Sequence, residues 1–275
     1  MKNLLALFLI AILAVSMTTS CKKEKGNPPT LPIASSMTID FSNFEASSKS
    51  AGMVLPKGVN EINWDYAALV ASYWDAIITG TLVVPVTAYK LAIDQTPTYV
   101  STKTWQWSYT ASVASVSYTA RLTGEITSSN VVWNMYLSES GGYSDFKWFT
   151  GTSSLDGTSG QWILNISPTN DNPILQINWY KSSTDIDSIR YTYVRTLTDS
   201  GASDPFNGSY IKYGLTTGTY NAYYNVYFYY LTGFYNANID WSTTGIIGKV
   251  QCLNYFGDNN WYCWDANHVD ATCTQ

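Results

Sequence analysis

Histidine is nearly missing from this chain of 275 residues, which contains only His268. That scarcity argues against multi-histidine metal sites and against most catalytic groups that depend on an imidazole. Charged residues are also few, at 13% of the chain, about half of the ~25% usual in soluble domains. Four of the 15 Lys and Arg residues but only one of the 20 acids lie in the first 30 residues, so the rest carries a net charge of −8. Because no basic stripe can form from that composition, we expect no nucleic-acid partner.

Aromatic side chains are abundant instead. They make up 15% of the chain, and 33 of the 42 are Tyr or Trp. Apolar residues reach 45%, which is enough to build a core and is not typical of a disordered chain.

The first 20 residues have the features of a secretory signal. The start, Met1-Lys2-Asn3, is positively charged, and the apolar run from Leu4 to Val15 is shorter than the ~20 residues that a membrane-spanning helix needs. The run ends in Ser16-Met17-Thr18-Thr19-Ser20-Cys21. This ending resembles a bacterial lipoprotein signal, in which a small residue precedes the Cys that is acylated and becomes the mature N-terminus. An ordinary cleaved signal peptide that happens to precede a Cys is the alternative.

The lipoprotein resemblance implies that acyl chains on Cys21 attach the protein to a membrane. Residues 21–30 are then a polar tether, and acyl chains that each contribute ~0.8 kcal/mol per buried methylene would hold the protein firmly. The residue after the Cys is Lys22 and not the Asp that commonly retains lipoproteins at the inner membrane. We therefore expect the outer membrane of the cell envelope.

Residues 31–275 are expected to form a single β-rich domain. One amphipathic helix is predicted near 63–78, with Asn63 as its cap and Gly80 just beyond its end. A second short helix over 85–93 competes with a strand that begins at 82, and a first strand is plausible over 37–41. From Lys103 onward apolar and polar residues alternate in about eleven runs joined by short turns.

The fold class is therefore all-β with a minor helical part. An antiparallel meander of about eleven strands cannot stay flat, because twist accumulates along the sheet. We predict that it curls into a barrel or half-barrel covered by the N-terminal amphipathic helix, with a two-sheet sandwich as the alternative. A barrel that itself spans the membrane is less consistent with a polar outward face.

Large aromatic residues occupy the face assigned inward. They either fill the core or line a ligand cavity. The tryptophans that we single out as ligand-binding candidates are Trp105, Trp107, Trp133, Trp148 and Trp179.

Three cysteines remain if Cys21 is acylated. Export to an oxidising compartment favours a disulfide between Cys263 and Cys273, which leaves Cys252 buried and free. Pairing through Cys252, or a zinc site with His268, is the alternative, but the spacing lacks a Cys-x-x-Cys knuckle.

Catalytic patterns are weak. The strand acids Glu125, Asp145 and Asp240 fall on the outward parity, and the chain has no nucleophile elbow and no phosphate-binding glycine loop. We expect no enzyme, no cofactor and no metal.

Two functions fit the sequence. The first is a non-enzymatic binding module that holds an apolar or amphiphilic ligand; its layout, though no diagnostic motif, resembles that of the helix-plus-curved-sheet lipoprotein carriers and the lipocalins. The second is a surface-displayed recognition protein in which outward Tyr223, Tyr227 and Tyr229 stack on sugars or on a protein partner.

Overall fold

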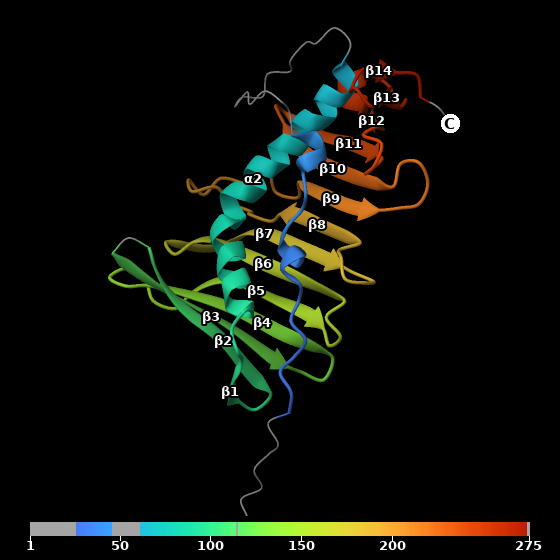
Figure 1. Cartoon of the computed structure of the whole chain (residues 1–275). Helices are drawn as coiled ribbons and strands as arrows, with labels where there is room; N and C mark the ends of the chain where they lie inside the picture. Colours follow the sequence, from blue (N-terminus) through green and yellow to red (C-terminus); the bar gives the residue numbers. More distant parts are fainter. Residues whose placement is uncertain (1–25, 46–60, 114, 274–275) are drawn as a thin grey trace, which may run out of the picture.

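The chain from Thr98 onward forms one long antiparallel sheet in which each strand pairs with its sequence neighbours (Figure 1). The structure is a computed structural model that describes residues 26–45, 61–113 and 115–273. The predicted signal peptide and Cys21 lie outside the described residues, as does the first half of the tether. The strands are β1 Thr98–Ser101, β2 Thr104–Val113, β3 Val116–Ile126, β4 Asn130–Glu139, β5 Phe146–Ser154, β6 Ser159–Ser167, β7 Asn170–Tyr180, β8 Ser188–Tyr193, β9 Tyr210–Leu215, β10 Ala222–Tyr230, β11 Gly233–Trp241, β12 Gly248–Gln251, β13 Tyr262–Trp264 and β14 Asp270–Ala271.

The β-rich class and the antiparallel meander are confirmed, but the sheet has 14 strands and not about eleven. The predicted runs correspond to β2 through β12. The additional strands β1, β13 and β14 have 4, 3 and 2 residues, which is too short for alternation to be recognised. The order begins at β1 and ends at β14, and no pair joins these two edges within the described part of the chain. The pairing therefore does not confirm a closed barrel.

One helix, α2 (Ile62–Ile93), crosses a face of this sheet diagonally (Figure 1). The prediction of a helix near 63–78 was too short, because α2 has 32 residues and continues through Gly80 and Pro85. Packing explains the difference, because Leu82, Val86 and Tyr89 beyond the predicted end are buried. The Tyr89 ring contacts Phe149 and Trp162 of the sheet. Tertiary burial supplies most of the stability of a helix in a protein and outweighs these two unfavourable residues.

Parts of α2 that do not face the sheet are also apolar. Val83 is 60% exposed, and Val84 and Leu91 are exposed as well. By length and composition alone, α2 could cross a membrane, although in this fold it is the helix that covers the sheet.

Asn63 does not cap α2 as predicted. It lies inside the helix. The N-cap residue is Glu61, whose side chain makes no capping hydrogen bond. The backbone N–H of Asn63 instead donates to Asp270 Oδ1 at 2.9 Å, so a carboxylate 207 residues away satisfies one of the free N–H groups of the first turn.

The N-terminal segment 26–45 runs beside α2 across the same face of the sheet (Figure 1). The strand expected over 37–41 does not form: Met37 ends the 3-10 helix η1 (Ala34–Met37), and residues 38–41 connect it to the 3-10 helix η2 (Ser42–Phe44). Side chains of the sheet hold it: Trp162 Nε1 donates to Ser36 Oγ at 3.1 Å, and the Tyr224 hydroxyl donates to the Asp40 carbonyl at 2.6 Å.

We call the face under α2 and segment 26–45 the covered face, and the other the open face. On the covered face, tryptophans alternate with glycines across neighbouring strands. Trp133 pairs with Gly124 on β3 and with Gly151 on β5, which in turn pairs with Trp162 on β6. A Cβ on Gly151 would lie 2.3 Å from the Trp162 ring, so the indole needs the space that glycine leaves. This pairing buries large rings without bending the sheet away from α2.

Candidate functional site

The five tryptophans proposed as ligand contacts do not form one site. Trp107, Trp133 and Trp179 are buried in the core, and the Trp107 and Trp133 ring centres are 5.8 Å apart. Trp105 and Trp148 are only partly buried. None of the five lines any of the three cavities described below. For Trp107, Trp133 and Trp179 the core interpretation fits better than the cavity interpretation.

Trp148, which we assigned inward, lies at a bulge of β5 and packs only partly against the core. Met135 pairs with Phe149, whereas Tyr136 pairs with Lys147, so the register shifts and Trp148 has no partner on β4. At this bulge Phe149 takes the fully buried position. The Trp148 ring contacts the rings of Tyr143 and Phe146. A bulge reverses the parity of every later residue in the strand.

Two cavities lie along one flank of α2, on either side of Tyr73, and we name them together the helix-flank cleft. The smaller has a volume of about 60 Å³ and the larger about 240 Å³. Both are walled mainly by carbon, with aromatic rings from the helix and from the strand ends of β8, β10 and β11. The smaller is lined by Tyr66, Leu69, Val70, Tyr73, Phe228, Tyr230, Tyr235 and Tyr255, and the larger by Tyr73, Trp74, Ile77, Tyr193, Phe206 and Ser209.

The larger cavity has a polar group at its wall. The Tyr193 hydroxyl donates to Asp204 Oδ2 at 3.0 Å, and Arg195 Nε lies 3.7 Å from the same oxygen. Burial, together with this hydrogen bond to Asp204, raises the pKa of Tyr193 to about 12. The tyrosine therefore stays neutral and the carboxylate is held beside a guanidinium. The indole N–H of Trp74, another residue of this wall, has no hydrogen-bond partner among the described residues.

A third cavity of about 240 Å³ lies between segment 26–45 and the middle of α2. Its walls are Met37, Ile39, Ile78, Leu82, Val83 and Val86, with polar side chains at the edge. It is wider open to solvent than the helix-flank cleft and has fewer aromatic rings.

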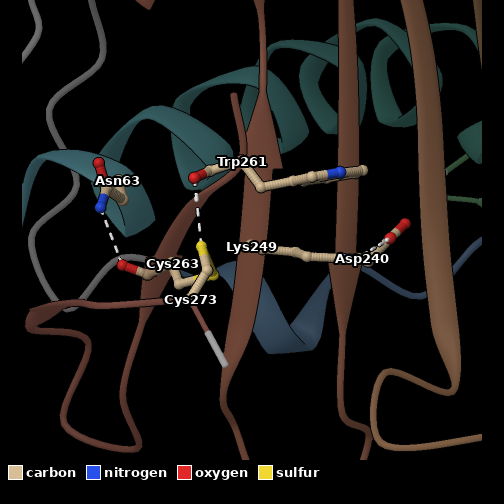
Figure 2. The surroundings of a disulfide bond; sticks show 6 residues. All are labelled: Asn63, Asp240, Lys249, Trp261, Cys263 and Cys273. Atoms are coloured by element: carbon tan, nitrogen blue, oxygen red, sulfur yellow. Dashed lines mark hydrogen bonds and ion pairs between the residues drawn. A yellow bond between two sulfur atoms is a disulfide. The ribbon is translucent and has the colours of Figure 1, made fainter. Parts of the chain in front are cut away.

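The disulfide Cys263–Cys273 is present, and Cys252 is free and buried, as predicted. Figure 2 shows Asn63 of α2 pointing toward this disulfide: its side-chain amide donates to the Cys263 carbonyl at 2.8 Å. His268, in the loop that the disulfide closes, stacks on Trp64 with ring centres 3.9 Å apart. The C-terminal loop therefore fastens the beginning of α2 to the sheet.

The three strand acids considered in the sequence do not pair with one another. Glu125 is exposed, and Asp145 forms an ion pair with Arg121 at 2.8 Å. Burial raises the pKa of Asp240, while Lys249 at 3.4 Å opposes that shift. In the part of the chain that the structure describes, no group of three or more His, Cys, Asp or Glu side chains is placed to hold a metal ion.

Comparison of the chain with family models, curated proteins and solved structures found no match. The fold and its cavities are therefore the basis for assigning a function.

Sequence reasoning missed the helix-flank cleft. Its far wall comes from residues 194–209, the long connection between β8 and β9, which shows no alternation of its own. Long connections often carry functional residues. The length of this one was the signal that could have directed attention to Tyr193 and Phe206.

Proposed function

We propose that this protein is a non-enzymatic binding module that holds an amphiphile in the helix-flank cleft. The observation that carries this proposal is a pair of aromatic-lined cavities separated by Tyr73, with the polar group of Tyr193, Arg195 and Asp204 at one wall. Apolar cavities with a few convergent polar groups are the usual form of small-molecule sites. An acyl chain fits the apolar walls, and its head group would lie near Arg195.

This site replaces the barrel interior as the place of the ligand. The long twisted sheet supports a half-barrel in which α2 and segment 26–45 occupy the hollow. A hollow already filled by Trp133, Trp162 and the helix has little room for a guest, because protein cores are close-packed. The flank of α2, where packing is incomplete, has that room.

We also propose that the protein is lipid-anchored in the bacterial cell envelope, through Cys21 and the polar tether, at the outer membrane. Replacing Cys21 by Ala should move the protein from the membrane fraction to the soluble fraction, because the acyl chains would then be missing. Fractionation followed by immunoblotting measures this. If the variant stays with the membrane, another part of the chain holds it there, and the exposed apolar side of α2 around Val83 is the first segment to examine.

Ligand binding can be tested on the full chain carrying Cys21→Ser, which needs no detergent if the anchor proposal holds. A dansyl-labelled fatty acid should increase its emission on binding to the protein. In Ile77→Trp the larger side chain would occupy part of the 240 Å³ cavity and obstruct a bound chain, and we expect at least tenfold weaker binding.

Ala76→Trp is the matched control, because Ala76 is the exposed neighbour on the same helix and lines none of the three cavities. It should bind the probe as the parent does. Equal binding by Ile77→Trp and the parent, with both proteins folded by circular dichroism, would show that the cleft is not the site. No binding by the parent would reject the amphiphile proposal itself.

A further inference from the structure

A row of polar side chains crosses the open face of the sheet. It contains one residue from each of seven consecutive strands, joined by the strand pairing: Gln161, Asn178, Arg190, Lys212, Asn225, Asn238 and Gln251. Six strand spacings of about 4.8 Å give the row a length of about 29 Å. We call it the open-face row.

The amides of the row satisfy one another at both ends. Asn178 Nδ2 donates to Gln161 Oε1 at 3.3 Å on one side. On the other side Asn225 Nδ2 donates to Asn238 Oδ1 at 3.0 Å, and Asn238 Nδ2 donates to Gln251 Oε1 at 3.1 Å. Between these two chains of hydrogen bonds lie the cations Arg190 and Lys212.

Arg190 and Lys212 are directly opposite each other on β8 and β9. The Cβ atoms of directly opposite residues lie about 5 Å apart, and like charges in that position are destabilising. No acid relieves them: their neighbours in the row and along the two strands are Asn178, Asn225, Ser188, Thr192, Tyr210 and Gly214.

Two other cations in this half of the sheet do have acidic partners. Lys249 has Asp240 at 3.4 Å, and Arg195 has both Asp199 and Asp204. The chain carries 20 acids and a net charge of −5, so acids are not scarce. Among the described residues, no ion pair involves Arg190 or Lys212. These two side chains are the only charged members of the open-face row, and their positive charge is not neutralised by an acid.

Tyrosine rings flank the two cations. The Arg190 guanidinium lies 3.8 Å from the centre of the Tyr210 ring, and Lys212 Nζ lies 5.6 Å from that of Tyr223. A Cβ on Gly214 would come within 2.4 Å of the Tyr223 ring, which shows that this ring lies flat on the sheet. A flat ring presents its other face away from the sheet.

We propose that the open-face row binds a carboxylate-bearing polysaccharide, a chain of uronic-acid type. A carboxylate would lie between Arg190 and Lys212, since the planar guanidinium matches a carboxylate with two parallel hydrogen bonds. The amides on both sides donate and accept, as sugar hydroxyls require. The Tyr223 ring offers a surface on which a pyranose ring can stack, and the length of the row suits an extended chain.

The test is electrophoresis of the full chain carrying Cys21→Ser through gels that contain polygalacturonate, and it measures how far the polymer retards the protein. Gels that contain dextran, a neutral polymer, are the control. Polygalacturonate should retard the protein and dextran should not. Arg190→Gln and Lys212→Gln keep side chains that continue the amide row, and each should weaken binding at least tenfold. Lys90→Gln removes the same charge from the exposed side of α2 and should leave binding unchanged.

A charge reversal separates binding from folding. Lys212→Glu should abolish retardation and raise the melting temperature, because it converts the opposed cations into an ion pair with Arg190. Ile77→Trp should bind polygalacturonate normally, since the helix-flank cleft lies on the covered side. This proposal therefore stands or fails independently of the amphiphile site.

Several results would overturn the proposal. Absence of retardation by polygalacturonate would do so, as would an equal loss of binding in Lys90→Gln. Equal retardation by dextran sulfate would mean a general response to polyanions. Equal retardation by polyglutamate would assign the row to an acidic peptide and not to a sugar.

Discussion

Replacing Trp133 by Ala should lower the free energy of unfolding by about 3–5 kcal/mol. The Trp133 side chain is 0% exposed, and its indole N–H donates to Ser153 Oγ at 2.9 Å. Its ring lies over Gly124 and contacts Trp107 in the middle of the covered face. Removing it would leave a cavity between β3 and β5 that glycines on both sides cannot fill, and it would leave the buried Ser153 hydroxyl without a donor. Urea unfolding followed by circular dichroism measures the change.

Trp148→Ala is the matched control for this prediction. It removes the same side chain from a position that is only partly buried, beside the bulge on β5, so we expect a loss of about 1 kcal/mol. Equal losses at the two positions would contradict the assignment of full burial to Trp133 and partial burial to Trp148.

Loss of the disulfide should destabilise the protein by about 3 kcal/mol. The Cys263–Cys273 bond closes a loop across a sequence separation of 10, and the chain-entropy relation gives about this value for such a loop. The double variant Cys263→Ser, Cys273→Ser should therefore unfold at a lower urea concentration than the parent. Treatment of the parent with a reductant should reproduce the shift, whereas the double variant should not respond to the reductant.

The part of the protein that becomes less stable without the disulfide can also be predicted. Asp270 and the Cys263 carbonyl both accept hydrogen bonds from Asn63, so the first turn of α2 should exchange its amide hydrogens faster in the double variant. Amides near Tyr89, at the other end of the helix, should keep their protection. Cys252→Ala removes the free buried thiol, keeps the disulfide and should leave exchange in the first turn unchanged. Faster exchange along the whole of α2 would instead mean that the helix detaches as one unit.

The central strands were predictable because one physical rule covers them. Each has a face against α2 and a face toward solvent, so apolar and polar residues alternate, as in β10 from Ala222 to Tyr230. Tyr224 and Phe228 are buried as their parity requires, and Tyr223 and Tyr227 lie on the open face. The disulfide was predictable for a different reason, since export and three remaining cysteines leave few pairings.

Other features depend on contacts between distant parts of the chain. The stretch 85–93, which could be read as a helix or a strand, belongs to α2, and no local signal predicted one continuous helix through Gly80 and Pro85. The bulge at Trp148 follows from the pairing of β4 with β5. The helix-flank cleft joins Tyr73 to Phe206, more than a hundred residues away, and no local pattern predicts that these two residues meet.

By itself, the sequence determined the class of fold, the order of the central strands and the face that residues of the regular strands, such as β10, occupy. These properties depend on the period of the side chains along a strand, which is local. Only the tertiary structure decided where packing is complete and where it is not. Packing depends on the shapes of side chains that meet from separate elements. The structure is therefore needed to see the filled core around Trp133, the cleft beside Tyr73 and the opposed cations Arg190 and Lys212.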